Sequence, residues 1–191
     1  MNEPTYTTDQ RFENIHFHKQ PLVIGEYDNC IFSGCDLSNV DLSYIAFVDC
    51  QFIDCNLSMV KLNQTAIRNT HFTECKMVGL HFDHCKAFLF SASFKKCLLN
   101  MSYFPQMKLK KTVFQYSILQ EVDFAQTDLT EADFKNCDLA GAIFDNSILE
   151  KADFREAVNF SIDPDSNRIK KAKFSAQELA GLLHKYQLAI Y

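Results

Sequence analysis

The sequence predicts an all-β solenoid, a right-handed quadrilateral β-helix of about seven coils that ends in a short C-terminal α-helix. Three observations predict it. A large apolar residue recurs every five residues over three quarters of the 191-residue chain, and the position two residues earlier is small. Gly (5) and Pro (4) are scarce, which argues against a sandwich or barrel built from tight turns.

The repeat has two registers, residues 12–82 and residues 89–154. Fifteen apolar residues follow one another from Phe12 to Phe82, and thirteen follow from Phe94 to Phe154 with Phe and Leu alternating. A period of five fits neither an amphipathic helix nor a strand. The chain is therefore expected to turn a corner every five residues, with four units to a coil. One predicted column of the core contains Phe94, Phe114, Phe134 and Phe154.

Each unit reads as a small residue, a polar residue, Leu or Phe, and two variable residues, as in Thr127–Glu131 and Ala132–Asn136. This motif resembles the pentapeptide-repeat family, whose consensus is A(D/N)LXX. The resemblance covers the expected β-helical domain, residues 10–157. All eight cysteines occupy the small position, so we expect buried thiols that pack as small apolar residues.

Three segments interrupt or follow the repeat. Residues 1–9 are expected to form an N-terminal tail. A register slip of two residues lies at about 83–92, where Phe88 or Phe90 should project outward. Residues 158–191 are expected to form a connector, a helix over 176–186 and a tail. Ser175–Glu178 has the spacing of a capping box at the start of that helix.

A repeat rod with an apolar C-terminal helix is similar to the gyrase-protecting subgroup of the family, the Qnr-type and microcin immunity proteins. The segments Ile162–Ile169 and Leu182–Tyr186 are most like the microcin immunity protein. The resemblance implies a homodimer in which two rods join end to end. The implied interface contains Leu179, Leu182, Leu183, Tyr186, Leu188 and Ile190. A helix that only caps the solenoid is the alternative.

Charge is banded along the chain although the net charge is only −5. Residues 84–120 contain six lysines and no acid, whereas residues 121–157 contain ten acids and three bases. Asp or Asn one residue before the centre is part of the repeat, so acids in other positions are stronger evidence for function. The predicted acidic partner-binding surface contains Glu121, Asp123, Asp128, Glu131, Asp145, Glu150 and Glu156.

No motif in the sequence predicts catalysis or a cofactor. There is no Gly-rich phosphate loop, nucleophile elbow or HExxH sequence. His81, His84 and Cys85 lie near the slip, but Cys85 should point inward and the histidines outward, so no metal site is expected. The N-terminus shows no signal peptide and no apolar run could span a bilayer, so a cytoplasmic location is expected.

The resemblance implies a DNA-mimicking protein that binds DNA gyrase or topoisomerase IV and protects it from a quinolone, a microcin or a similar poison. A rod with carboxylates along its side could present a charge pattern like that of duplex DNA. It would bind no nucleic acid, membrane or small-molecule substrate itself. The alternatives are an interaction scaffold with no topoisomerase role and a binder of an acidic partner through the six lysines of residues 84–120.

Overall fold

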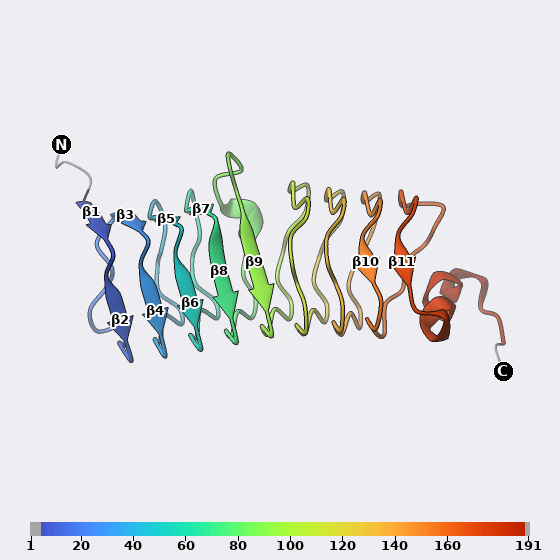
Figure 1. Ribbon diagram of the computed structural model, residues 1–191, viewed down its shortest axis with the longest axis horizontal. Helices are drawn as coiled ribbons and strands as arrows, with labels where there is room; N and C mark the ends of the chain where they lie inside the picture. The colour runs from blue at the N-terminus through green and yellow to red at the C-terminus, as the bar shows by residue number, and fades with distance from the viewer. Residues whose placement is uncertain (1–4, 190–191) are drawn as a thin grey trace.

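The large apolar residues of the repeat line the axis of a right-handed quadrilateral β-helix, which forms an elongated rod in the computed structural model (Figure 1). The structure describes residues 5–189. The strands are β1 Thr5–Thr8, β2 Arg11–Glu13, β3 Gly25–Asp28, β4 Ile31–Ser33, β5 Ala46–Val48, β6 Gln51–Ile53, β7 Ala66–Arg68, β8 Thr70–Thr73, β9 Ala92–Lys95, β10 Asp153–Phe154 and β11 Lys173–Phe174. Three 3₁₀ helices are also present: η1 Phe82–His84, η2 Ala176–Leu182 and η3 His184–Tyr186.

All the strands pair in parallel with the equivalent strand of the next coil. The sheets have the orders β1-β3-β5-β7, β2-β4-β6-β8-β9 and β10-β11. Pairing partners differ by 20 residues, as in Phe32 with Phe52, which is four units of the repeat; β8 and β9 are the exception and differ by 22. Between β9 and β10 the coils continue as isolated parallel bridges at the same spacing, for example Asp123 with Ile143.

One column of phenylalanine rings runs through the rod from end to end. Its members are Phe12, Phe32, Phe52, Phe72, Phe94, Phe114, Phe134, Phe154 and Phe174, and neighbouring rings stack with centroids 4.5–5.4 Å apart. Nine rings in succession correspond to eight turns, about one more than the sequence predicts. Phe94, Phe114, Phe134 and Phe154 have no exposed side-chain surface. A second column stacks Phe82, Phe104, Phe124 and Phe144.

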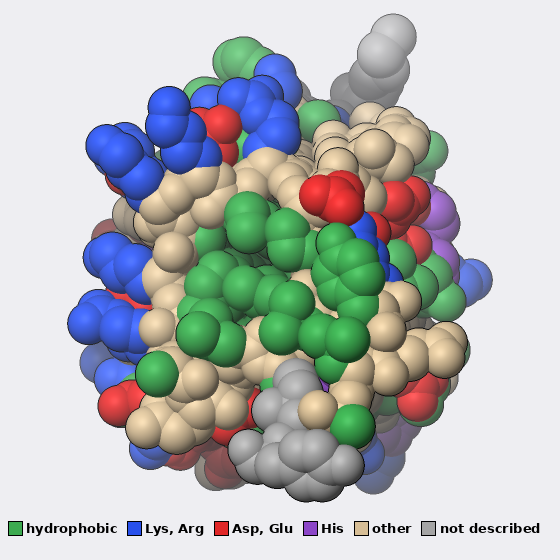
Figure 2. Space-filling view, turned by 90° about the vertical axis from the view of Figure 1, so that its right-hand side faces the viewer, with side chains coloured by type: hydrophobic (Ala, Val, Ile, Leu, Met, Phe, Trp, Pro, Cys, Tyr) green, Lys and Arg blue, Asp and Glu red, His purple; other side chains and the backbone are tan. Residues whose placement is uncertain are grey.

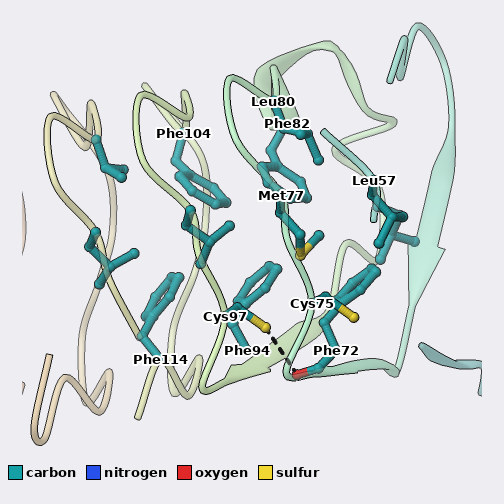
Figure 3. Packing of buried hydrophobic residues seen from close by; sticks show 14 of the residues in the cluster. Leu57, Phe72, Cys75, Met77, Leu80, Phe82, Phe94, Cys97, Phe104 and Phe114 are labelled. Carbon is teal, nitrogen blue, oxygen red and sulfur yellow. Dashed lines mark hydrogen bonds between the residues drawn. The ribbon is translucent and has the colours of Figure 1, made fainter. Parts of the chain in front are cut away.

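The second inward position mostly holds small residues, and its polar members hydrogen-bond as well as pack. Thr127 Oγ1 donates to the carbonyl of Phe104 at 2.7 Å, and Ser147 Oγ donates to that of Phe124 at 2.8 Å. Cysteine thiols occupy equivalent positions, and Cys97 Sγ lies 3.5 Å from the carbonyl oxygen of Phe72 (Figure 3). All eight cysteines are buried and free.

The two additional residues of the register slip form a loop between Lys86 and Ala92. Lys86 N still donates to Thr65 O, in the 20-residue register, whereas Ala92 pairs with Thr70, 22 residues earlier. Leu89 was expected to begin the second inward series, but it is 61% exposed, so that series begins at Phe94. Phe88 projects outward and is 74% exposed, and Phe90 packs against the core.

The solenoid extends further than residues 10–157 at both ends. At the N-terminus β1 pairs with β3 from Thr5 onward, so residues 5–9 belong to the first coil. At the C-terminus β11 pairs with β10, and Asn167 takes an inward position and accepts a hydrogen bond from Ser147 N at 2.9 Å. The segment expected to be a connector is therefore largely a final coil.

The C-terminal helix begins at Ala176 as predicted but is 3₁₀ rather than α. The expected capping box does not form, because Ser175 Oγ accepts a hydrogen bond from Glu156 N at 2.9 Å instead. Gly181 lies against Phe160, where an added Cβ would come within 2.5 Å of the ring, and its carbonyl accepts a bond from Ile162 N. No helix in residues 5–189 is long and apolar enough to cross a membrane.

Candidate protein-binding surfaces

The repeat determines where each outward side chain lies. Most units leave the residues before and after their centre at least partly exposed on one side of the rod. The next residue usually occupies a corner with positive φ, as at Glu121 (58°), Glu131 (61°) and Glu156 (63°). Because four units complete a coil, residues 20 apart share a column. Corner side chains project furthest from the axis and are the natural contact points for a partner.

Two of the seven predicted acids stabilise turns of the repeat. Asp123 Oδ1 accepts a hydrogen bond from Ala125 N at 2.8 Å, and Asp128 Oδ1 accepts bonds from Thr130 N at 3.2 Å and Thr130 Oγ1 at 2.6 Å. Partial burial raises the pKa of Asp128, but the bonds from Thr130 and the nearby Lys110 ammonium outweigh this and hold the pKa below its ordinary value. These carboxylates therefore have a structural role.

Three of the predicted acids are paired with cations. Glu131 lies 2.9 Å from Lys151 Nζ and 3.8 Å from Lys111 Nζ, and the hydrogen bond from Lys151 lowers its pKa. Glu150 pairs with Arg168 at 2.7 Å. Asp128 lies 3.3 Å from Lys110. The basic and acidic bands of the sequence thus meet across adjacent coils and partly neutralise each other.

The seven predicted acids do not form one stripe along the rod. Glu131 and Glu156 lie at two different corners, and Glu156 accepts a hydrogen bond from Asn136 Nδ2 at 2.9 Å. The structure brings together Glu121, Asp123 and Asp145, which lie on or beside the side of the rod centred on Phe104, Phe124 and Phe144. We call these three residues the acidic group. None of them forms an ion pair within the described part of the chain.

The C-terminal end of the rod is apolar. Leu179, Leu183, Tyr186 and Leu188 are 36–57% exposed, whereas Leu182 packs against the core. Ile190 lies outside the described residues. Figure 2 shows apolar side chains gathered in the middle of this end, with charged side chains around them. Lys185 holds the helices to the last coil through ion pairs with Asp163, at 2.6 Å, and with Asp165.

The loop between Lys86 and Ala92 provides a third exposed surface. Phe88 and Leu89 project from it, and a groove of about 770 Å³ lies between the loop and residues 105–108 of the next coil. The two-residue slip signals this loop in the sequence. The groove itself could not be predicted from the sequence, because it is formed jointly by the loop and by Pro105 and Met107 of the next coil.

The cysteines are buried, and none belongs to a cluster of potential metal ligands in the described part of the chain. Burial raises the pKa of Cys137 to about 12 and holds the pKa of the Cys85 thiol far above its ordinary value. Cys97 is an exception, because a hydrogen bond with Cys75 lowers its pKa, but it is fully buried. A thiol that stays protonated and buried is neither a nucleophile nor a ready metal ligand.

Comparison with known proteins identifies the family. The pentapeptide repeat region family matches residues 26–88 and 80–154. The chain belongs to this family. Comparison with curated proteins finds no significant sequence match.

QnrB1 shares the fold of this pentapeptide-repeat protein in two solved structures. Trypsin-treated QnrB1, a plasmid-mediated fluoroquinolone resistance protein, is 15% identical with a TM-score of 0.63, over 98% of this chain and 100% of that one. Full-length QnrB1 is 16% identical with a TM-score of 0.50, over 96% and 100%. HetL, involved in heterocyst differentiation regulation in the cyanobacterium Nostoc, is 14% identical with a TM-score of 0.45, over 87% and 84%.

Proposed function

We propose that this protein binds a type II topoisomerase, DNA gyrase or topoisomerase IV, and protects it from a quinolone, a microcin or a similar poison. It acts by binding and not by catalysis. The observation that carries the proposal is the apolar C-terminal end of the rod, with Leu179, Leu183, Tyr186 and Leu188 exposed. Such an end would let two copies join into one rod of twice the length. The shared fold with a fluoroquinolone resistance protein over the whole chain adds support.

DNA mimicry is the proposed mode of binding, and the acidic group is its proposed centre. A topoisomerase surface that grips duplex DNA is positively charged, because DNA carries about one negative charge per 1.7 Å of its axis. Glu121, Asp123 and Asp145 offer unpaired carboxylates on adjacent coils, whereas Glu131 and Glu150 are already neutralised by cations of the same chain. The proposed DNA mimicry therefore depends on the acidic group rather than on all seven acids.

The direct test is gyrase supercoiling with ciprofloxacin or a microcin over a wide titration of the purified protein. Restored supercoiling and fewer cleavage complexes are the expected results. No effect on either measurement with gyrase and with topoisomerase IV would refute the proposal.

A pair of matched variants tests DNA mimicry. Glu121→Gln, Asp123→Asn and Asp145→Asn together remove three unpaired charges, and the amide oxygen introduced by Asp123→Asn can still accept the turn hydrogen bond from Ala125 N. Glu131→Gln, Glu150→Gln and Glu156→Gln remove the same number of charges elsewhere. Protection should fall at least about tenfold in the first variant and change little in the second, since charge complementarity governs association. Equal losses would contradict a role specific to the acidic group.

The proposed homodimer is tested by Leu183→Glu. Light scattering should give a dimer for the wild type and a monomer for the variant, because a buried unpaired carboxylate strongly destabilises an interface. Leu98→Glu is the matched control, since Leu98 is 39% exposed but lies on the side of the rod. A monomeric wild type would contradict the homodimer and show that η2 and η3 only cap the solenoid.

One observation favours the second candidate, an interaction scaffold without a topoisomerase partner. The ion pairs of Lys110, Lys111 and Lys151 with acids of adjacent coils make much of the C-terminal rod locally neutral. A scaffold would leave supercoiling unchanged in all conditions, which separates it from the first candidate in the same titration.

A further inference from the structure

Three potential metal ligands converge on η1, immediately before the loop. His81, Asp83 and His84 each offer a ligand atom, and these atoms all lie within 4.8 Å of one another. Phe82, between them, is fully buried and stacks on Phe104, so it anchors the turn while its neighbours point outward. Sequence reasoning considered His81 and His84 with Cys85, but the third converging residue is Asp83.

The distances between these groups suit a shared cation. Nδ1 of His81 lies 3.3 Å from one carboxylate oxygen of Asp83, and Nε2 of His84 lies 3.8 Å from the other. Two ligands of a tetrahedral zinc ion with bonds of ~2.1 Å are separated by about 3.4 Å. The separations therefore match a shared cation, and the His84 ring must turn out of its stack on His81 so that both nitrogen lone pairs point at the ion.

Ring stacking holds His81 in place. The His81 ring stacks on Tyr103 of the next coil with centroids 4.3 Å apart and planes 1° from parallel, and on His84 with centroids 4.8 Å apart. The three side chains remain accessible, with 46%, 27% and 49% of their surface exposed for His81, Asp83 and His84. The stack on Tyr103 fixes the His81 ring, and the exposure of Asp83 and His84 leaves these two side chains room to turn toward a cation.

Asp83 has no role in the repeat that would explain its position. A second cluster, His16, His18 and Asp36, offers a useful contrast. Asp36 lies one residue before a centre, and its Oδ1 accepts hydrogen bonds from Ser38 N at 3.0 Å and Ser38 Oγ at 2.7 Å. Asp83 lies one residue after a centre, and within residues 5–189 the ion pairs of its carboxylate are those with the two histidines.

We propose that His81, Asp83 and His84 bind one divalent transition-metal cation of the zinc class. Imidazole and carboxylate ligands together suit such ions. Three protein ligands leave at least one position for water or for a group of a partner. The bound cation ties η1 together where the chain leaves the regular ladder, and it lies on the side of the rod that carries the acidic group two to three coils further on.

The test is calorimetric titration of metal-free, reduced protein with Zn²⁺. One site per chain is expected. His81→Phe keeps a ring to stack on Tyr103 but removes the ligand, and Asp83→Asn and His84→Gln remove the other two. Each should weaken binding by at least about tenfold. His71→Gln, an exposed histidine on β8 outside the cluster, should change the affinity less than twofold.

Other outcomes would overturn the proposal. The absence of saturable binding would do so, as would binding that survives His81→Phe and His84→Gln but is lost in His16→Gln. Titration with Co²⁺ gives a second readout, because a thiolate-to-cobalt absorption band would assign the metal to cysteines instead. Unchanged circular dichroism of the metal-free variants shows that the fold is retained, so a lost site reflects lost ligands.

Discussion

The coils before the loop and the coils after it turn their corners differently. In the N-terminal segment, residues 5–84, the two middle coils each have two corners that are turns closed by a hydrogen bond, such as that from Val40 N to Leu37 O at 3.0 Å. The extended corners of the segment contain the strands β1 to β8. In the C-terminal segment, residues 92–174, turns close all four corners of the coil that begins at Leu99.

The residue one before the centre stabilises many of the turns. Where it is Asp or Asn, its side chain accepts a hydrogen bond from the backbone N–H two residues later and stabilises a turn. This bond is made by Asp36, Asp41, Asn56, Asp123, Asp128, Asp133, Asp138 and Asp153. The extended corners hold Glu26, Ile31, Ala46, Gln51, Ala66 and His71 in this position. The consensus acid thus stabilises a turn as well as charging the surface, although turns also close without it, as at Leu99 and Phe104.

The largest expected effect tests whether the two segments unfold as one unit. Phe52→Ala and Phe134→Ala should each cost about 3–5 kcal/mol, because each leaves a cavity in the ring column. Phe72 and Phe94 stack across the loop at 5.4 Å, so urea unfolding followed by circular dichroism should show one transition for both variants. Two transitions, with only one displaced by each variant, would show that the loop uncouples the segments.

A smaller effect is expected from Asp153, which lies at the centre of an ion-pair network found in the C-terminal segment. Its carboxylate receives hydrogen bonds from Arg155 at 2.9 and 2.7 Å and lies 3.3 Å from Lys135. The Arg155 guanidinium holds the pKa of Asp153 far below its ordinary value. Asp153→Asn should cost about 1.5–3 kcal/mol at pH 7.

The same variant predicts a dependence on pH. A carboxyl whose pKa is depressed by folding stabilises the protein above its unfolded pKa of about 3.9, and this stabilisation is lost as pH falls through the folded pKa. The stability difference between wild type and Asp153→Asn should therefore narrow as the pH falls below about 4. Asp54→Asn, on the N-terminal segment, is the control and should show no comparable gap. If the stability difference between wild type and Asp153→Asn stayed constant from pH 7 to pH 2, the negative charge of Asp153 could not be its source.

The smallest expected effect compares two corners within the N-terminal segment. Asp41→Ala removes the bond from Ser43 N at 2.9 Å and should cost about 0.5–1.5 kcal/mol, and Asp41→Asn should recover most of it. Gln51→Ala, at an extended corner, should change stability by less than about 0.5 kcal/mol. Thermal unfolding measures all three. An equal cost for Asp41→Ala and Gln51→Ala would show that the Asp side chain does not stabilise the turn.

The repeat made most of the fold predictable, because each unit carries its own inward residue and the same pattern recurs at every coil. The ends were harder to predict. Asn167 fills an inward position that the repeat gives to small residues, and it does so by bonding to Ser147 N and Phe144 O in a contact across coils. Ser175 was matched to a local capping pattern, but a bond from Glu156 of the preceding coil uses its hydroxyl.

The candidate surfaces were only partly predictable for a similar reason. A count of charge along the chain places Lys111 and Glu131 in opposite bands, whereas the coil places them in one column, 3.8 Å apart. Position within the repeat was a better guide than sequence distance. Asp128 lies one residue before a centre and supports a turn, whereas Glu121 lies at a corner and does not.

The 20-residue coil also fixes where each surface feature lies along the rod and in which direction it projects. The loop between Lys86 and Ala92 lies four coils from Phe174, the last ring of the column. The number of residues between them determines both the distance along the rod and the direction in which the loop projects. Removing residues 115–134 would bring the loop nearer the C-terminal end by ~4.8 Å and leave its direction unchanged. Removing residues 115–124 would instead turn it to the opposite side of the rod. Reach and direction can thus be adjusted separately, by whole coils and by single units.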